Sequence, residues 1–146
     1  MKHDLQTAET IRKFNRVYLP YFHLLDQKYL GTEYSVTEAR ILYEIYDREG
    51  LCATDIVQRF HVDKGYLSRI LKKFQSRGLI QRVSSEEDSR IRCITLTENG
   101  KQLTQELIGK SNQQISDDIA DLAAEELHAL SVHLQAVMDL IEDTSV

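Results

Sequence analysis

Lysine and arginine side chains gather in one part of the chain, between Arg59 and Arg92. This segment holds nine basic residues, at positions 59, 64, 69, 72, 73, 77, 82, 90 and 92, against four acidic ones, at 63, 86, 87 and 88. Nine bases against four acids give the segment a charge of +5, whereas the whole chain carries −5. A positive segment on an acidic protein is suited to binding the phosphates of a polyanion.

Residues 63–77 have the pattern of an amphipathic helix with a basic face. Its apolar stripe consists of Leu67, Ile70, Leu71 and Phe74, and Asp63 is a suitable N-cap. The N-terminal residues of a recognition helix meet base edges, and here these are Lys64, Gly65, Tyr66, Ser68 and Arg69. Further along the helix, phosphate contacts are predicted for Lys72, Lys73 and Arg77. A helix with a solvated basic face and no ligand would show the same pattern.

The residues after this helix favour the first interpretation. Segments 79–83 and 92–96 have strand character, and residues 84–91 would connect them as a hairpin. Arg90 and Arg92 then lie at a hairpin tip, where a minor-groove wing needs its arginines. Asp88 is expected to hold one of these arginines rigid. A basic helix followed by an arginine wing predicts DNA binding.

The other elements must position this helix and wing. Helices are expected over residues 4–29, with a kink or break at Pro20, over residues 53–60 and over 123–142. One more begins at a capping signature, either Ser35 with Glu38 or Thr37 alone, and another opens at Thr97. The order α-α-α-α-β-β-α-α predicts a mainly α (α+β) fold, a winged helix-turn-helix with flanking helices.

Composition sets the broad class of protein. The 146 residues, 42% hydrophobic and 28% charged, fit one globular domain without a membrane span or signal peptide. Two cysteines fit a reducing compartment, so a cytoplasmic protein is expected. No nucleophile–base pair, phosphate loop or metal-ligand set is evident. We therefore expect that the protein is not an enzyme and needs no cofactor. Cys52, near a helix start, could be redox-active, or simply a small residue at that position.

Three stretches of the sequence resemble the MarR (multiple antibiotic resistance regulator) family. They are YSVTEARILYEI, DKGYLSRILKKFQSRGLIQR and DSRIRCITLT. The last is similar to the wing signature of the family, Asp-x-Arg before a strand ending in Leu-Thr, here Asp88, Arg90, Leu96 and Thr97. The resemblance implies that Arg90 enters the minor groove and that residues 36–97 bind double-stranded DNA.

The resemblance also implies a homodimeric transcription regulator, a repressor, on an inverted-repeat operator. Residues 1–31 and 98–146 would form the helical dimerisation region of the single domain, with an interface that includes Leu5, Ile11, Leu130, Leu134, Met138 and Ile141. A small aromatic or anionic effector could bind among Arg12, Arg16, Tyr18, Tyr43 and Tyr46, although the pattern favours plain interfacial packing of the tyrosines. The alternative function is a winged-helix module whose basic face docks an acidic protein.

Overall fold

The structure is a computed structural model that describes residues 4–48 and 50–144. Its elements follow the predicted order, with one short 3-10 helix added after the first helix. They are α1 (Leu5–Tyr21), η1 (Tyr29–Gly31), α2 (Val36–Asp47), α3 (Ala53–Phe60), α4 (Lys64–Ser76), β1 (Ile80–Ser84), β2 (Arg92–Leu96), α5 (Glu98–Asp118) and α6 (Ala124–Thr144). The chain divides into two compact units, residues 1–112 and 113–146.

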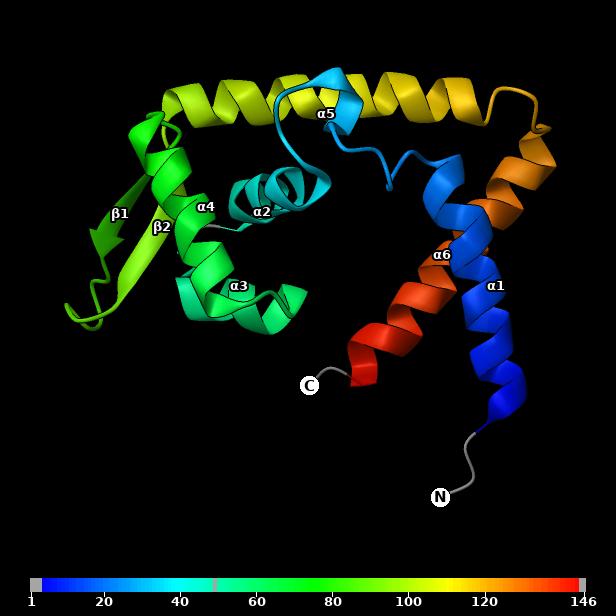
Figure 1. Cartoon of the computed structure of the whole chain (residues 1–146), viewed down its shortest axis with the longest axis horizontal. Coiled ribbons are helices and arrows are strands. Elements are labelled where there is room, and N and C mark those ends of the chain that lie inside the picture. The colour runs from blue at the N-terminus through cyan, green and yellow to red at the C-terminus, as the bar shows by residue number, and fades with distance from the viewer. Residues whose placement is uncertain (1–3, 49, 145–146) are drawn as a thin grey trace. The chain divides into compact units, whose positions relative to one another are not determined.

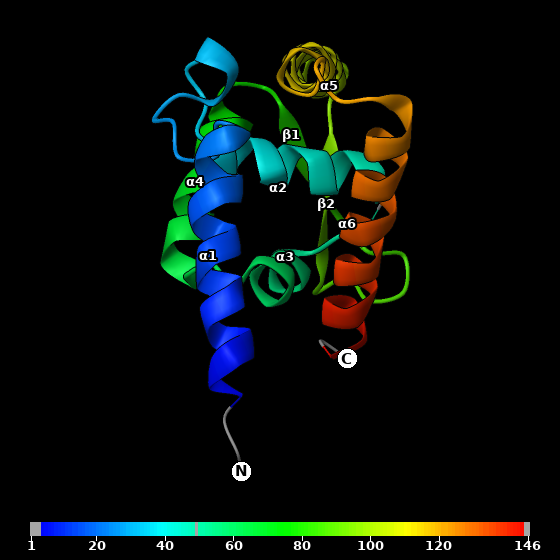
Figure 2. The same ribbon diagram turned by 90° about the vertical axis from the view of Figure 1, so that its right-hand side faces the viewer.

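The central part of the first unit is a winged helix-turn-helix, as the sequence predicts. Helices α2, α3 and α4 group together with the two-stranded antiparallel sheet beside them (Figures 1 and 2). The register pairs Ile80 with Leu96 and Ser84 with Arg92, and Leu51 adds an isolated bridge to Ile94. The core between these elements consists of fully buried side chains that include Ile41, Leu42, Ile56, Leu67, Leu71, Phe74, Ile94 and Leu107.

Local signals set the start of each helix in this module. Ser35 and Glu38 form a complete capping box at α2, which decides between the two predicted caps in favour of Ser35. The turn between α3 and α4 passes through His61 in the left-handed conformation. The side chain of Asp63 then accepts a hydrogen bond from the Tyr66 amide at 3.0 Å, as an N-cap does. The recognition helix therefore begins where the sequence places it.

The first helix is shorter than predicted. It ends at Tyr21, directly after Pro20, and does not continue to residue 29. Proline has no amide hydrogen to donate to the preceding turn, so the break predicted at this residue is confirmed. His23 follows in the left-handed conformation, and the chain then runs through turns to η1. The helical pattern of residues 22–25 arises from apolar side chains in a loop.

Helix α5 begins against the sheet. The Thr97 hydroxyl accepts a hydrogen bond from the Gly100 amide at 3.1 Å, and the Thr97 amide donates to the Leu79 carbonyl at 3.0 Å. These bonds fix the start of α5 to the residue just before β1. Within residues 4–48 and 50–144, no helix is long and apolar enough to cross a membrane.

Candidate nucleic-acid interface

The exposed side of α4 carries most of the predicted base-reading residues. Lys64, Gly65, Tyr66 and Arg69 are exposed, and Ser68 is half-buried beside the apolar stripe. The Arg69 guanidinium lies over the Tyr66 ring, 5.9 Å from its centroid. An exposed contact of this kind is worth about 0.5–1 kcal/mol, enough to bias the arginine toward the helix N-terminus. The first two turns of α4 thus present two cations, a phenol and a hydroxyl to an incoming ligand.

Gly65 leaves room at the beginning of this helix. A Cβ at this position would lie 3.1 Å from an Asp63 carboxylate oxygen and 3.9 Å from an Arg69 guanidinium nitrogen. Any side chain there would crowd the N-cap carboxylate. The glycine therefore keeps the helix N-terminus open, where unpaired amides and the helix dipole favour a negatively charged group.

The wing has the arrangement that the sequence predicts for Asp88 and Arg90. Asp88 accepts hydrogen bonds from the Arg90 amide at 3.0 Å and from its guanidinium at 3.2 and 3.3 Å. These bonds, the guanidinium ones first, hold the pKa of Asp88 below its ordinary value. The Arg90 side chain is 89% exposed and Asp88 only 34%. The carboxylate orients an arginine that remains open to solvent, and Arg92 is exposed at the start of β2.

Three of the nine bases in the positive segment face acids that lie outside it. Arg59 contacts Glu44 at 2.6 Å, Lys73 contacts Glu38 at 2.7 Å and Arg77 contacts Glu33 at 2.8 Å. The charge that the segment presents to a ligand is therefore smaller than its +5 suggests. Lys72, by contrast, is exposed, as are Lys64 and Arg69. The two lysines predicted to contact phosphate differ in their surroundings.

A depression of about 260 Å³ lies between α3, α4 and β1. Its floor is apolar, and its polar rim consists of Thr54, Lys64, Ser68 and Arg82. The Nε atom of Arg82 is buried there and has no hydrogen-bond partner among the described residues. Sequence reasoning counted Arg82 among the bases but did not place it in this depression, since only the fold brings it beside α3.

The residues predicted for an effector pocket fall into two groups. Arg12, Arg16 and Tyr18 lie on α1, where the Tyr18 ring stacks on Phe14. On α2, the Tyr43 hydroxyl lies 3.0 Å from that of Tyr29, and Tyr46 contacts Gln105.

Burial, together with the hydrogen bond between the Tyr43 and Tyr29 hydroxyls, raises the pKa of Tyr43 above its ordinary value, and this phenol is neutral at physiological pH. A neutral phenol can donate or accept a hydrogen bond to a ligand. A small-molecule site that joins the α1 and α2 groups remains a prediction.

The predicted dimer residues are exposed or partly exposed. Leu5 is 76% exposed, and Ile11, Met138 and Ile141 are also exposed. Leu130 and Leu134 are half-buried, and α1 has no buried residue at all. Apolar side chains at helical spacing on two helices are what a helical protein–protein interface requires. A dimer interface that includes these side chains remains a prediction.

Comparison with known proteins places the fold in a family. The family model described as "MarR family" matches residues 33–91. The organic hydroperoxide resistance transcriptional regulator of Bacillus subtilis is 33% identical over 97 residues, 66% of this chain and 61% of that protein. The transcriptional regulator SarZ of Staphylococcus haemolyticus is 32% identical over 81 residues, 56% of this chain and 55% of that protein. The chain thus spans less than two thirds of these relatives' length.

A solved structure extends the likeness beyond the central module. A mutant of E. coli MarR in complex with operator DNA has a TM-score of 0.68 and 21% sequence identity. The match covers 94% of this chain and 99% of that one, so the shared fold includes the flanking helices. Together with the Asp88–Arg90 wing, these similarities identify residues 33–91 as a winged helix-turn-helix module of the MarR family.

Proposed function

We propose that the protein is a sequence-specific DNA-binding transcription regulator. The observation that carries the proposal is the wing arginine, Arg90, which is exposed and oriented by two guanidinium bonds to Asp88. A minor-groove reader needs its cation fixed before binding, because ordering a flexible arginine on DNA would cost conformational entropy. The exposed first turns of α4 then read the adjacent major groove.

Contacts to the DNA backbone would come from a second group of residues. Lys72 on the outer side of α4, Arg82 in the depression and Arg92 on β2 are the bases that we assign to phosphates. Such contacts set affinity and register without reading sequence. The acidic remainder of the chain repels phosphate, and so it favours approach of the DNA to this face alone.

The functional unit would be a homodimer. The apolar side chains exposed on α1 and α6 need a cover, and a second copy of the chain would provide it with two-fold symmetry. Two recognition helices related in this way fit an inverted-repeat operator with half-site centres about 10 base pairs apart. In its full form, the proposal is a cytoplasmic repressor that binds this operator. A small molecule that binds near Tyr18, Tyr43 and Tyr46 would release it from the DNA.

Binding should be specific and strongly dependent on salt. Fragments of genomic DNA selected by the protein should bind tighter than random DNA of equal length, as measured by fluorescence anisotropy. Each phosphate contact releases counterions, so the logarithm of affinity should fall with the logarithm of salt concentration, with a slope of about −0.9 per contact. Light scattering on the same sample should give a dimer mass.

The alternative is a winged helix that docks an acidic protein. It predicts a salt-dependent affinity without any preference between selected and random DNA. Equal affinity for both DNAs would therefore contradict the proposed function.

A further inference from the structure

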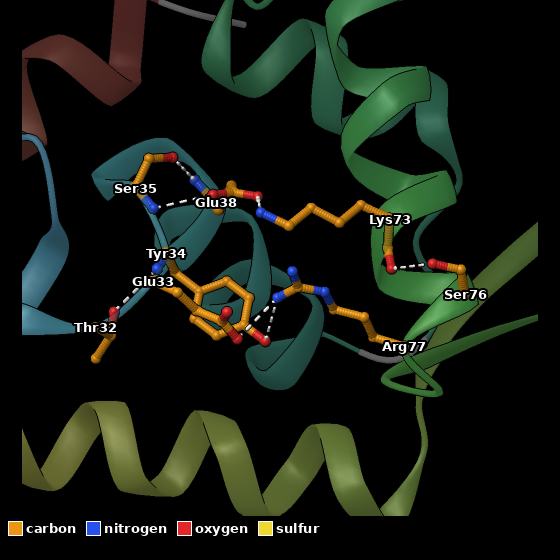
Figure 3. Close-up of polar contacts among 8 residues, drawn as sticks. All are labelled: Thr32, Glu33, Tyr34, Ser35, Glu38, Lys73, Ser76 and Arg77. Carbon is orange, nitrogen blue, oxygen red and sulfur yellow. Dashed lines mark hydrogen bonds and ion pairs between the residues drawn. The ribbon is translucent and has the colours of Figure 1, made fainter.

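Lys73 points away from the exposed side of α4, toward the beginning of α2. Its ammonium group lies 2.7 Å from a carboxylate oxygen of Glu38, which is 8% exposed (Figure 3). The ammonium also lies over the ring of Tyr34, 5.4 Å from its centroid. A lysine held by a buried carboxylate and an aromatic face is poorly placed to reach the phosphates of DNA. Its contacts are with the protein.

Glu38 makes two bonds in different directions. One carboxylate oxygen accepts a hydrogen bond from the Ser35 amide at 3.0 Å and completes the capping box of α2. The other oxygen accepts a hydrogen bond from the Lys73 ammonium group. Burial alone would raise the pKa of Glu38, but the bonds from Lys73 and Ser35, with the charge of Lys73, outweigh it and keep that pKa below its ordinary value. The same charged side chain thus caps one helix and ties it to another.

The loop before α2 extends this link. Arg77, one turn after Lys73, donates to Glu33 at 2.8 Å and to the Tyr34 hydroxyl at 3.3 Å, and its guanidinium lies 5.6 Å from the centre of the Tyr34 ring (Figure 3). Tyr34 is buried, and its backbone carbonyl accepts the Tyr29 amide at 2.8 Å. The C-terminal half of α4 is therefore bonded to the segment that leads from η1 into α2.

We propose that Glu38 and Lys73 are positioning residues that set the orientation of the recognition helix and do not contact DNA themselves. The inference rests on the proposed DNA-binding function. It reassigns Lys73 from the phosphate contacts that the sequence suggests for it. Arg77 has the same role through Glu33 and Tyr34.

The packing of α4 explains why such a link is needed. The apolar stripe of Leu67, Ile70, Leu71 and Phe74 fixes which side of the helix is buried, but hydrophobic contacts have little directionality. Hydrogen-bonded ion pairs have defined donor and acceptor directions. An ion pair at Lys73 restrains rotation of α4 about its axis, and so it determines where Lys64, Ser68 and Arg69 point.

Neighbouring lysines provide a matched test of this proposal. Lys72 and Lys73 are adjacent, so their side chains leave α4 about 100° apart. Lys72→Met should remove a phosphate contact, which lowers the affinity for operator and random DNA alike and reduces the salt slope by about one. Lys73→Met should instead lower operator affinity by roughly threefold to thirtyfold and leave random-DNA affinity and salt slope unchanged. Anisotropy titrations at several salt concentrations measure both.

Further variants distinguish positioning from general loss of structure. Lys73→Arg keeps the ion pair and should restore operator preference. Glu38→Gln keeps the capping box but removes the charge, so it should reproduce the loss, and the double variant Glu38→Gln/Lys73→Met should lose no more than either single one. If Lys73→Met fails to fold by circular dichroism, Glu38→Gln provides the same comparison.

Several results would overturn the inference. If Lys73→Met lowered random-DNA affinity and salt slope as Lys72→Met does, Lys73 would be a phosphate contact. An unchanged operator preference, or additive losses in the double variant, would show that the pair does not position α4. A wild-type protein without operator preference would instead contradict the proposed function itself.

Discussion

Replacing Arg90 with alanine should lower operator affinity by about 1–3 kcal/mol, the loss typical of one specific arginine contact. The side chain is 89% exposed and bonds to Asp88 within the same hairpin, so its removal should not disturb the core. The free energy of unfolding and the dimer mass should stay at their wild-type values. Anisotropy titration with operator DNA measures the affinity, and circular dichroism and light scattering check the fold and the mass.

Two further substitutions in the wing show which property of Arg90 matters. Arg90→Lys keeps the charge but loses the planar fork that bonds to both Asp88 oxygens, so part of the affinity should be lost. Asp88→Asn keeps the size of the side chain and weakens the hold on Arg90, which should lower affinity less than Arg90→Ala does. Unchanged operator affinity in Arg90→Ala would show that the wing does not contact DNA.

The sequence predicts this wing well because its contacts are local. Asp88 and Arg90 are two residues apart, and the turn between the strands brings them together whatever surrounds them. The same holds for the capping box, in which Ser35 and Glu38 are three residues apart. Short-range hydrogen bonds of this kind need only the backbone conformation that their own residues favour. The fold class and element order are predictable for the same reason.

Contacts between distant residues could not be predicted in this way. The apolar stripe on α4 predicts which side of the helix is buried. It does not predict the partner of Lys73, because Glu38 lies 35 positions earlier in the sequence. Only the packing of α2 on the recognition helix brings these residues together, and so the sequence predicts a phosphate contact for a lysine that is half-buried against Glu38. Pro20 gives the opposite case, since its effect on α1 was predicted although the apolar pattern continued beyond it.

Gly100 is the second position at which a substitution should have a large effect, and here a single added carbon is enough. A Cβ there would lie 2.0 Å from the Leu79 carbonyl oxygen and 3.2 Å from the Leu96 side chain. The carbonyl is backbone, and it already accepts the Thr97 amide, so it cannot turn aside without loss of that bond. Gly100→Ala must therefore move α5 away from the sheet. We expect the free energy of unfolding to fall by about 2–3 kcal/mol, as in an overpacked core.

Gly109 on the same helix is the matched control. Apart from the backbone of its own helix and its chain neighbours, no atom of the described residues lies within 4 Å of a Cβ built there, so Gly109→Ala adds a methyl group in open space. Alanine is favoured over glycine inside a helix, and this variant should be more stable by about 0.5–1 kcal/mol. Urea unfolding followed by circular dichroism measures both variants. If the two substitutions had the same effect, the close approach of α5 to Leu79 would not be what excludes a side chain at Gly100.

The two outcomes together also bear on DNA binding. The start of α5 is bonded to Leu79, the residue that precedes β1, and the wing extends from that sheet. A displacement of α5 at Gly100 would therefore be transmitted to the base of the wing, whereas a methyl group at Gly109 would not. Gly100→Ala should weaken operator binding at temperatures where it is still folded, and Gly109→Ala should bind as the wild type does. Wild-type operator affinity in folded Gly100→Ala would show that the wing is independent of α5.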